Sequence, residues 1–147
     1  MKGFLKECNF FPDGLSGINT MEECEAYIVQ HCLSYETFHH FLNEKIGERS
    51  ISVPELMKKS CINKNYGYNI LNGVRKKPSR DKTIALCIAA RMTLEETQYA
   101  LILARQPILF WKDERDVRIA FGIKSEIFDV MKLNIILTEC GVAPLEV

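Results

Sequence analysis

The sequence predicts an all-α fold, and three observations support this prediction. Apolar residues recur at every third or fourth position along the 147-residue chain, a spacing that places them on one face of a helix. Helix-capping residues repeatedly precede these periodic stretches. No stretch alternates apolar and polar residues for long enough to predict a strand. We therefore expect about seven or eight helices packed around one core.

The first two helices are expected in the N-terminal third of the chain. Thr20 and Glu23 have the spacing of a capping box, which predicts a helix from Met21 to about Cys32. Ser34 is placed to cap a second helix. The apolar stripe of this second helix consists of Phe38, Phe41, Leu42 and Ile46.

Two short helices are expected next, joined by about three residues. Ser52 and Glu55 form a second capping box, which predicts a helix over about residues 53–60. Asn63 can cap the following helix, and Gly73 is placed to end it in a left-handed conformation.

The remainder of the chain predicts two pairs of helices. In the first pair, Ser79 caps a helix rich in isoleucine and leucine. Thr93 and Glu96 open the next helix as a third capping box, and Pro107 ends it.

The second pair is expected over about residues 114–121 and 126–140. Gly122 and Gly141 stand where helix-terminating glycines usually lie.

The charge of the chain is unevenly distributed, although it sums to zero. Residues 1–49 hold 4 basic and 8 acidic side chains, and residues 83–147 hold 7 basic and 9 acidic ones. Residues 50–82 hold 8 basic and 2 acidic side chains, a net charge of +6. The total therefore excludes only a protein that binds nucleic acid through a uniformly basic body, and it directs attention to this central segment.

The central segment also carries the strongest functional signal, a helix, a tight turn and a second helix around Cys61. This is the arrangement that places a second helix in the major groove of DNA. Asparagine can pair bidentately with adenine, and lysine can reach guanine acceptors or a phosphate. The positions of the second helix that can face outward are Lys64, Asn65, Tyr68, Asn69 and Asn72.

A basic loop follows the second helix directly. Its cations, with those at the start of the next helix, could bind the phosphate backbone of a duplex. They are Arg75, Lys76, Lys77, Arg80 and Lys82. Lys58 and Lys59 of the preceding helix are also expected to attract phosphate groups.

The segment from Leu56 to Gly73, LMKKSCINKNYGYNILNG, resembles the core of lambda-repressor-like helix-turn-helix domains of the XRE type. The pattern continues through Lys76-Lys77-Pro78-Ser79 into an apolar helix and then Leu94-Glu95-Glu96, as is typical of that family. The resemblance covers about residues 34–106 and implies a five-helix DNA-binding domain there. Residues 1–33 then form an N-terminal helical extension.

The last part of the chain resembles a variant of the same family that has a helical C-terminal appendage. The resemblance lies in Pro107-Ile-Leu-Phe-Trp111-Lys-Asp-Glu-Arg115-Asp116 and in Cys140-Gly-Val-Ala-Pro144-Leu. It implies an appendage over residues 107–147.

The resemblance implies a sequence-specific DNA-binding regulator of transcription, of bacterial or phage type, that binds double-stranded DNA as a homodimer. The base-reading residues that it implies are Lys64, Asn65, Tyr68 and Asn69, and Asn72 matches a position that touches phosphate. The segments outside the domain would dimerise or receive a signal from a protein partner.

Four positions depart from the family pattern. Cys61 stands at a usual turn glycine, Met57 at a usual small alanine and Val53 at a usual polar residue. Gly67 replaces a usual β-branched residue, at a cost of roughly 1 kcal/mol in helix propensity against alanine, and Met57 is expected to refill part of that space. These departures keep an alternative open, a protein-interaction adaptor on a drifted helix-turn-helix scaffold.

Other function classes have weaker support in the sequence. We expect no enzyme, because no catalytic or phosphate-binding motif is present, and we expect no cofactor. Widely spaced cysteines, with no signal peptide and no membrane span, predict a cytoplasmic, reduced protein. We expect no metal site, because the cysteines and histidines of the N-terminal third lack a tight ligand pair. These are Cys24, His31, Cys32, His39 and His40.

Overall fold

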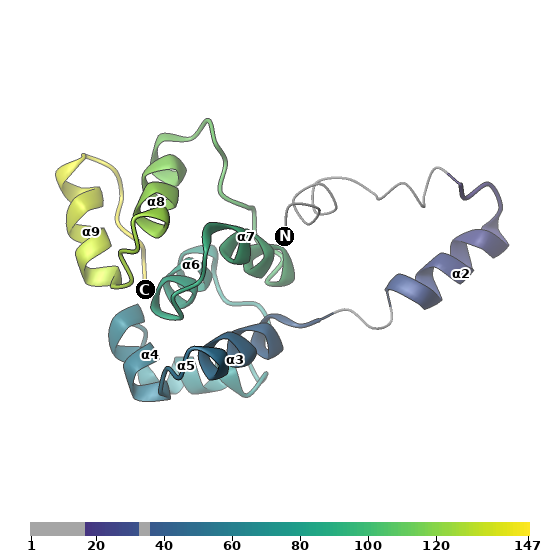
Figure 1. The fold of residues 1–147 in the computed structure, drawn as a ribbon, viewed down its shortest axis with the longest axis horizontal. Helices are drawn as coiled ribbons and strands as arrows, with labels where there is room; N and C mark the ends of the chain where they lie inside the picture. The colour runs from purple at the N-terminus through teal and green to yellow at the C-terminus, as the bar shows by residue number, and fades with distance from the viewer. Residues whose placement is uncertain (1–16, 33–35) are drawn as a thin grey trace. The chain divides into compact units, whose positions relative to one another are not determined.

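The computed structural model describes residues 17–32 and 36–147, and all regular structure in these ranges is helical. The all-α prediction is therefore confirmed for this part of the chain (Figure 1). The chain divides into two compact units, residues 1–36 and residues 37–147. The described helices are α2 (Met21–His31), α3 (Phe38–Glu48), α4 (Val53–Ser60), α5 (Lys64–Leu71), α6 (Arg80–Ala89), α7 (Leu94–Leu103), α8 (Glu114–Lys124) and α9 (Val130–Glu139).

The first unit contains α2, which begins where its sequence predicts. The Thr20 hydroxyl accepts a hydrogen bond from the backbone N–H of Glu23 at 3.1 Å, which satisfies one of the free donors at the helix start. Glu22 and Glu23 lie in the first turn, where the helix dipole favours acidic side chains. Met21 and Val29 of this helix are exposed.

The second unit contains α3 to α9. Its first helix is capped by Thr37, whose hydroxyl accepts from the backbone N–H of His40 at 3.4 Å. The cap that we expect at Ser34 lies outside the described residues. The apolar stripe of α3 is confirmed, because Phe38, Phe41, Leu42 and Ile46 are all buried.

The expected caps of the four middle helices are confirmed by short hydrogen bonds. The Ser52 hydroxyl accepts from Glu55 N–H at 3.2 Å, and the Ser79 hydroxyl accepts from Lys82 N–H at 3.2 Å. The Asn63 side chain accepts from the backbone N–H groups of the first turn of α5. Thr93 and Glu96 form a complete capping box, in which each side chain accepts from the other residue's backbone N–H group.

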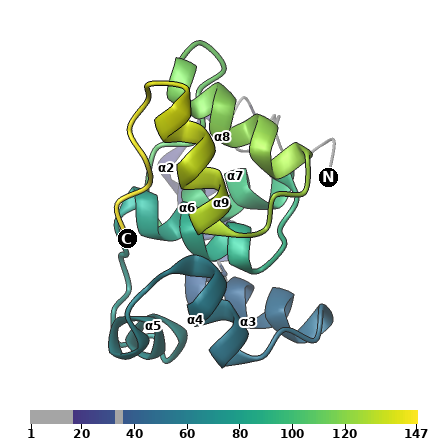
Figure 2. The ribbon, with the colours of Figure 1, turned by 90° about the vertical axis from the view of Figure 1, so that its left-hand side faces the viewer.

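Helix α6 forms the middle of the second unit. Every residue from Thr83 to Ala89 is buried, because α4, α7 and α9 all pack against this helix. Figure 2 shows α3, α4 and α5 in the lower half of this unit, and α6 to α9 in the upper half. The segment that we expect as an appendage, residues 107–147, thus packs on the helices that precede it within one unit.

Two expectations for the last two helices are wrong. Gly122 lies inside α8 rather than after it, and a Cβ atom there would lie 2.7 Å from Leu133 Cδ1 of α9. This glycine therefore allows a close approach of two helices. Helix α9 begins at Val130 rather than near residue 126, because Asp129 caps it by accepting from Met131 N–H at 3.0 Å.

Two other glycines end helices as expected. Gly73 follows α5 and Gly141 follows α9, each with a φ of +75°. This left-handed conformation is accessible to glycine without steric cost and reverses the chain after a helix. At Gly73 the reversal directs the chain into the basic loop, residues 74–79.

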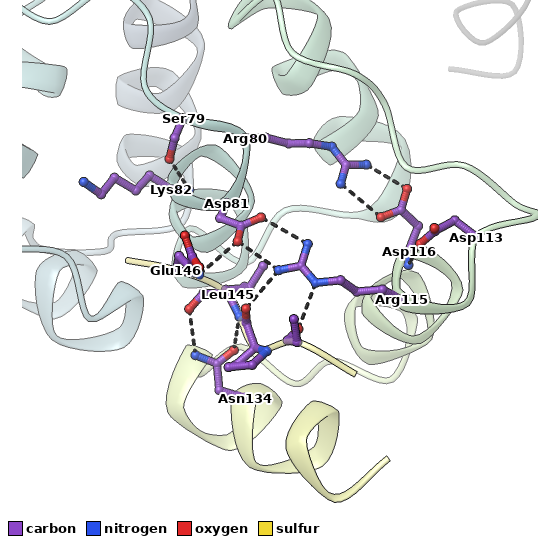
Figure 3. Close-up of polar contacts among 12 residues, drawn as sticks. Ser79, Arg80, Asp81, Lys82, Asp113, Arg115, Asp116, Asn134, Leu145 and Glu146 are labelled. Carbon is purple, nitrogen blue, oxygen red and sulfur yellow. Dashed lines mark hydrogen bonds and ion pairs between the residues drawn. The ribbon is translucent and has the colours of Figure 1, made fainter. Parts of the chain in front are cut away.

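The C-terminal segment, residues 142–147, is fastened back onto the start of α6 (Figure 3). Arg115 of α8 forms two hydrogen bonds with the carboxylate of Asp81, the shorter at 2.8 Å, and donates to the carbonyl groups of Ala143 and Pro144. The same carboxylate accepts from the backbone N–H of Glu146 at 2.9 Å. Three parts of the chain therefore meet at one ion pair.

Within the two described ranges, no helix combines the length and the apolarity that crossing a membrane requires.

Candidate nucleic-acid interface

Helices α4 and α5 form a helix-turn-helix with the short connection that the sequence predicts. Cys61, Ile62 and Asn63 join the two helices. Cys61 has a φ of +58°, which is the left-handed region that glycine adopts most cheaply and that costs other residues about 1–2 kcal/mol. Ile62 is 5% exposed and anchors the turn in the core. The turn therefore has the backbone conformation that glycine favours, although a cysteine occupies the position.

On the inner face of α5, a glycine packs against a large side chain of α4. Gly67 is buried, and a Cβ atom built on it would lie 2.6 Å from Met57 Cε. Met57 thus occupies the space that a larger side chain at position 67 would fill, as its adaptability leads us to expect. Ile70 and Leu71 complete the buried side of the helix.

The outer face of α5 brings the predicted reading residues together. All five of their side chains are exposed, and none of the three asparagine amides has a hydrogen-bond partner among the described residues. Amide groups without partners can bond to the edges of bases. These five residues are Lys64, Asn65, Tyr68, Asn69 and Asn72.

The basic loop lies against this face. Its Arg75 N–H donates to the carbonyl of Asn69 at 2.9 Å, which ties the loop to the last turn of α5. Arg75, Lys76 and Lys77 are exposed. Loop and helix thus present amide and cationic side chains together.

The cations of this surface have no acidic partners within the described ranges. Lys64, Arg75, Lys76, Lys77 and Lys82 form no ion pair with any described carboxylate. Many cations elsewhere in the second unit are paired. The paired cations are Lys45, Arg49, Lys59, Arg80, Arg91, Arg115 and Arg118.

Two of the predicted phosphate-contact residues, Lys59 and Arg80, are bound to acids elsewhere in the unit. Lys59 pairs with Asp129 at 3.3 Å. The Arg80 guanidinium forms two hydrogen bonds with the Asp116 carboxylate, at 2.7 and 3.0 Å (Figure 3). It also donates to the carbonyl groups of Pro107 and Ile108. Asp116 is 5% exposed. Arg80 therefore fastens α6 to α8 and to the segment before it, and its guanidinium is not available to a phosphate group.

Tyr66 is a residue of this surface that sequence reasoning missed. It is half-buried against the core, and both Arg75 and Lys82 lie over its ring. The distances from the ring centroid are 4.6 Å to Arg75 Cζ and 4.0 Å to Lys82 Nζ. The sequence shows only that basic residues lie close to Tyr66 along the chain. Whether their side chains reach its ring depends on the path of the loop between α5 and α6, which the sequence does not reveal.

Two histidines of α3 lie near the basic loop. The ring of His39 packs where a Cβ atom on Gly73 would stand, and it lies 4.4 Å from the ring of His40. Burial, His40 and Lys76 together lower the pKa of His39. Across the described residues, no group of three or more His, Cys, Asp or Glu side chains is placed to hold a metal ion.

The chain matches no protein-family model, no curated protein and no solved structure at a significant level. The functional assignment therefore depends on the geometry of this surface. A row of amides flanked by unpaired cations can bond to base edges while it neutralises phosphate groups.

Proposed function

We propose that this protein is a sequence-specific DNA-binding regulator of transcription, with α5 lying in the major groove of a duplex. The observation that carries the proposal is the coincidence on one surface of exposed asparagines with five cations, whose amides and charges have no hydrogen-bonding or acidic partner among the residues that the structure describes. A binding surface for any polyanion needs the cations. Only a surface that reads bases also needs hydrogen-bonding side chains on a helix that fits the groove.

We further propose that α3 to α7 form a five-helix domain of the lambda-repressor-like, XRE type. The three-residue turn supports this, since its left-handed Cys61 has the backbone that the family's turn glycine adopts. The contact of Met57 with Gly67 also supports it, because Met57 fills the space that the missing side chain at position 67 would otherwise leave empty in the core. A regulator of this kind acts in the cytoplasm of a bacterial cell, where we place the protein.

The expected energetics make the proposal quantitative. Each phosphate that a cation neutralises contributes about −0.9 to the slope of log K against log salt concentration. Five cations that each meet a phosphate give a slope of roughly −4 to −5. Each bidentate asparagine–adenine pair contributes about 1–3 kcal/mol of discrimination between bases.

The test is a titration of the full chain with random-sequence duplex DNA at about 50 and 200 mM salt, followed by selection of bound sequences from a random pool. We expect steeply salt-dependent binding and a selected consensus. A variant carrying Lys64→Ala and Asn69→Ala should bind more weakly and lose preference at the positions those side chains read.

The matched control is Lys124→Ala with Lys132→Ala, since these exposed lysines lie on α8 and α9, outside the proposed surface. Its binding should equal that of the wild type. Absence of binding by the wild type at the lower salt concentration would contradict the proposal. It would favour the alternative function, a protein-interaction adaptor on the same scaffold.

One observation bears on how the protein assembles. The α8 face, which we define as Phe110, Trp111, Val117 and Phe121, is apolar and exposed, and part of it lines a hollow of about 330 Å³. We propose that a second copy of the chain covers this face in a homodimer. A two-fold dimer presents two reading helices to a two-fold site, which one short helix cannot specify alone.

A further inference from the structure

We propose that Tyr66 holds Arg75 and Lys82 together as a single binding site for one phosphate group at the edge of the reading surface. This inference rests on the proposed function, in that the phosphate belongs to the DNA backbone. It assigns a positioning role to an aromatic residue that itself has no charge and no place among the base-reading side chains.

Three separate parts of the chain meet at this site. Tyr66 comes from α5, Arg75 from the basic loop and Lys82 from the first turn of α6. Both cations lie within the roughly 6 Å at which the face of an aromatic ring attracts a positive charge. The ring is fixed, because it packs against the core and its backbone N–H donates to the side chain of Asn63.

Two positive charges thus lie close to one aromatic ring. Arg75 Cζ and Lys82 Nζ lie no more than about 9 Å apart, since both lie within 5 Å of one ring centroid, so they repel each other. An acidic side chain would normally relieve this repulsion. None of the described carboxylates pairs with either cation.

The acids that lie at the start of α6 and bind to it already have other partners. Asp81 bonds to Arg115 and to the backbone of Glu146, and Asp116 bonds to Arg80. Figure 3 shows Lys82 extending away from these acids. Among the described residues, the two positive charges are therefore left available to an anionic ligand, and the surface on which the site lies favours a backbone phosphate.

The chemistry of the two cations suits a phosphate. The planar guanidinium of arginine donates two parallel hydrogen bonds to two oxygens, while a lysine ammonium supplies a compact charge to a third. Holding both long side chains on one ring before binding reduces the rotamer entropy that they would otherwise lose on contact. Arg75 N–H also bonds to Asn69 O, which links the site to the reading helix.

The first test compares Tyr66→Leu, which removes the ring, with Tyr66→Phe, which keeps it. In the DNA titration, Tyr66→Phe should match the wild type. Tyr66→Leu should weaken binding by about threefold to tenfold for all sequences alike and reduce the magnitude of the salt slope by about one. An unchanged slope in Tyr66→Leu, with wild-type DNA binding intact, would overturn this inference and leave the proposed function standing.

The second test does not depend on DNA. Inorganic phosphate is titrated into the full chain while the side-chain Nε–Hε signal of Arg75 is followed by NMR. We expect a saturable shift in the wild type and in Tyr66→Phe, and a much weaker one in Tyr66→Leu. A shift without DNA binding would support the site while contradicting the function, and no shift in the wild type would overturn the site.

A third test remains informative even if Tyr66→Leu fails to fold, because it changes the two cations and keeps the ring. Arg75 is exposed and Lys82 is partly exposed, and neither side chain belongs to the core, so we expect both Arg75→Gln and Lys82→Gln to fold. If the two cations share one phosphate, each single variant should lose most of the contact, and the double variant should lose little more. Independent, additive losses in DNA affinity would show two separate contacts and contradict the inference.

Discussion

At the scale of single residues, the contact between Met57 and Gly67 shows two departures from a family pattern that compensate each other. A larger residue on α4 fills the space left by a smaller one on α5. Each departure alone would predict a damaged core. Together they preserve the packing that holds the outer face of α5 in place.

This compensation makes a prediction for a double-mutant cycle. Gly67→Val alone forces Met57 aside and should cost about 1–3 kcal/mol, and Met57→Ala alone leaves a cavity and should cost about 2–5 kcal/mol. The two changes together should cost less than either one alone. Urea unfolding of the four proteins measures this, and losses that simply add would contradict the shared volume.

The distance over which a residue interacts decides how much of this structure the sequence could predict. The caps at Thr20, Ser52, Ser79 and Thr93 were predictable, because each hydrogen bond spans three residues. The outward residues of α5 followed from helical spacing alone.

Arg80 shows what could not be predicted. Its partner Asp116 lies 36 residues further along the chain, so a basic residue beside the loop looked free. Gly122 was misjudged for a similar reason, since its role depends on Leu133 of the next helix. Tyr66 was missed because the cations over its ring come from two other elements.

At the scale of elements, the start of α6 serves as an attachment point for the end of the chain. The Asp81 carboxylate bonds to Arg115 and to the backbone of Glu146. Asn134 of α9 adds a reciprocal pair of hydrogen bonds with the backbone of Leu145, whose side chain is 3% exposed. The C-terminal segment thus joins α6, α8 and α9.

The attachment predicts a dependence of stability on pH. Burial alone would raise the pKa of Asp81, but the hydrogen bonds from Arg115 and Glu146 outweigh it and lower the pKa below the value of 3.8 typical of an unfolded chain. The stabilisation is therefore complete above about pH 4 and is lost as the pH falls through the lowered pKa. Asp81→Asn should destabilise the protein by roughly 1–3 kcal/mol at pH 7, with a smaller difference in acid.

Thermal unfolding of wild type and Asp81→Asn across this pH range measures the effect. Glu139→Gln is the control, since this carboxylate is exposed on α9 and forms no ion pair with a described residue. It should follow the wild-type profile. An Asp81→Asn difference that stays constant from neutral to acid pH would show that the ionised carboxylate is not the stabilising group.

At the scale of the whole second unit, two surfaces differ in chemistry. One is the cationic reading surface of α5 and the basic loop, and the other is the apolar α8 face. Between them, α9 packs on α4 through buried residues and through an ion pair of Lys59 with Asp129 at 3.3 Å. Removing residues 107–147 would therefore uncover the core, so assembly is better tested by substitution.

The substitution Phe121→Ser tests assembly without disturbing the core, because this side chain is 67% exposed. We expect the variant to fold normally and to sediment as a monomer at concentrations where the wild type is dimeric. Val74→Ser changes a side chain that is 74% exposed but lies outside the α8 face, and it should leave the mass unchanged. If the wild-type protein is a monomer at every concentration measured, the proposal that the α8 face forms a dimer interface is wrong.

The position of Trp111 gives the molecule a built-in optical reporter. It is the single tryptophan of the chain, it is 75% exposed, and it belongs to the α8 face rather than to the reading surface. Its fluorescence emission should therefore be that of a solvated indole in the monomer and shift to shorter wavelength when a second copy excludes water from the ring. Self-association can in this way be followed without a label, and its signal can be separated from that of DNA binding at α5.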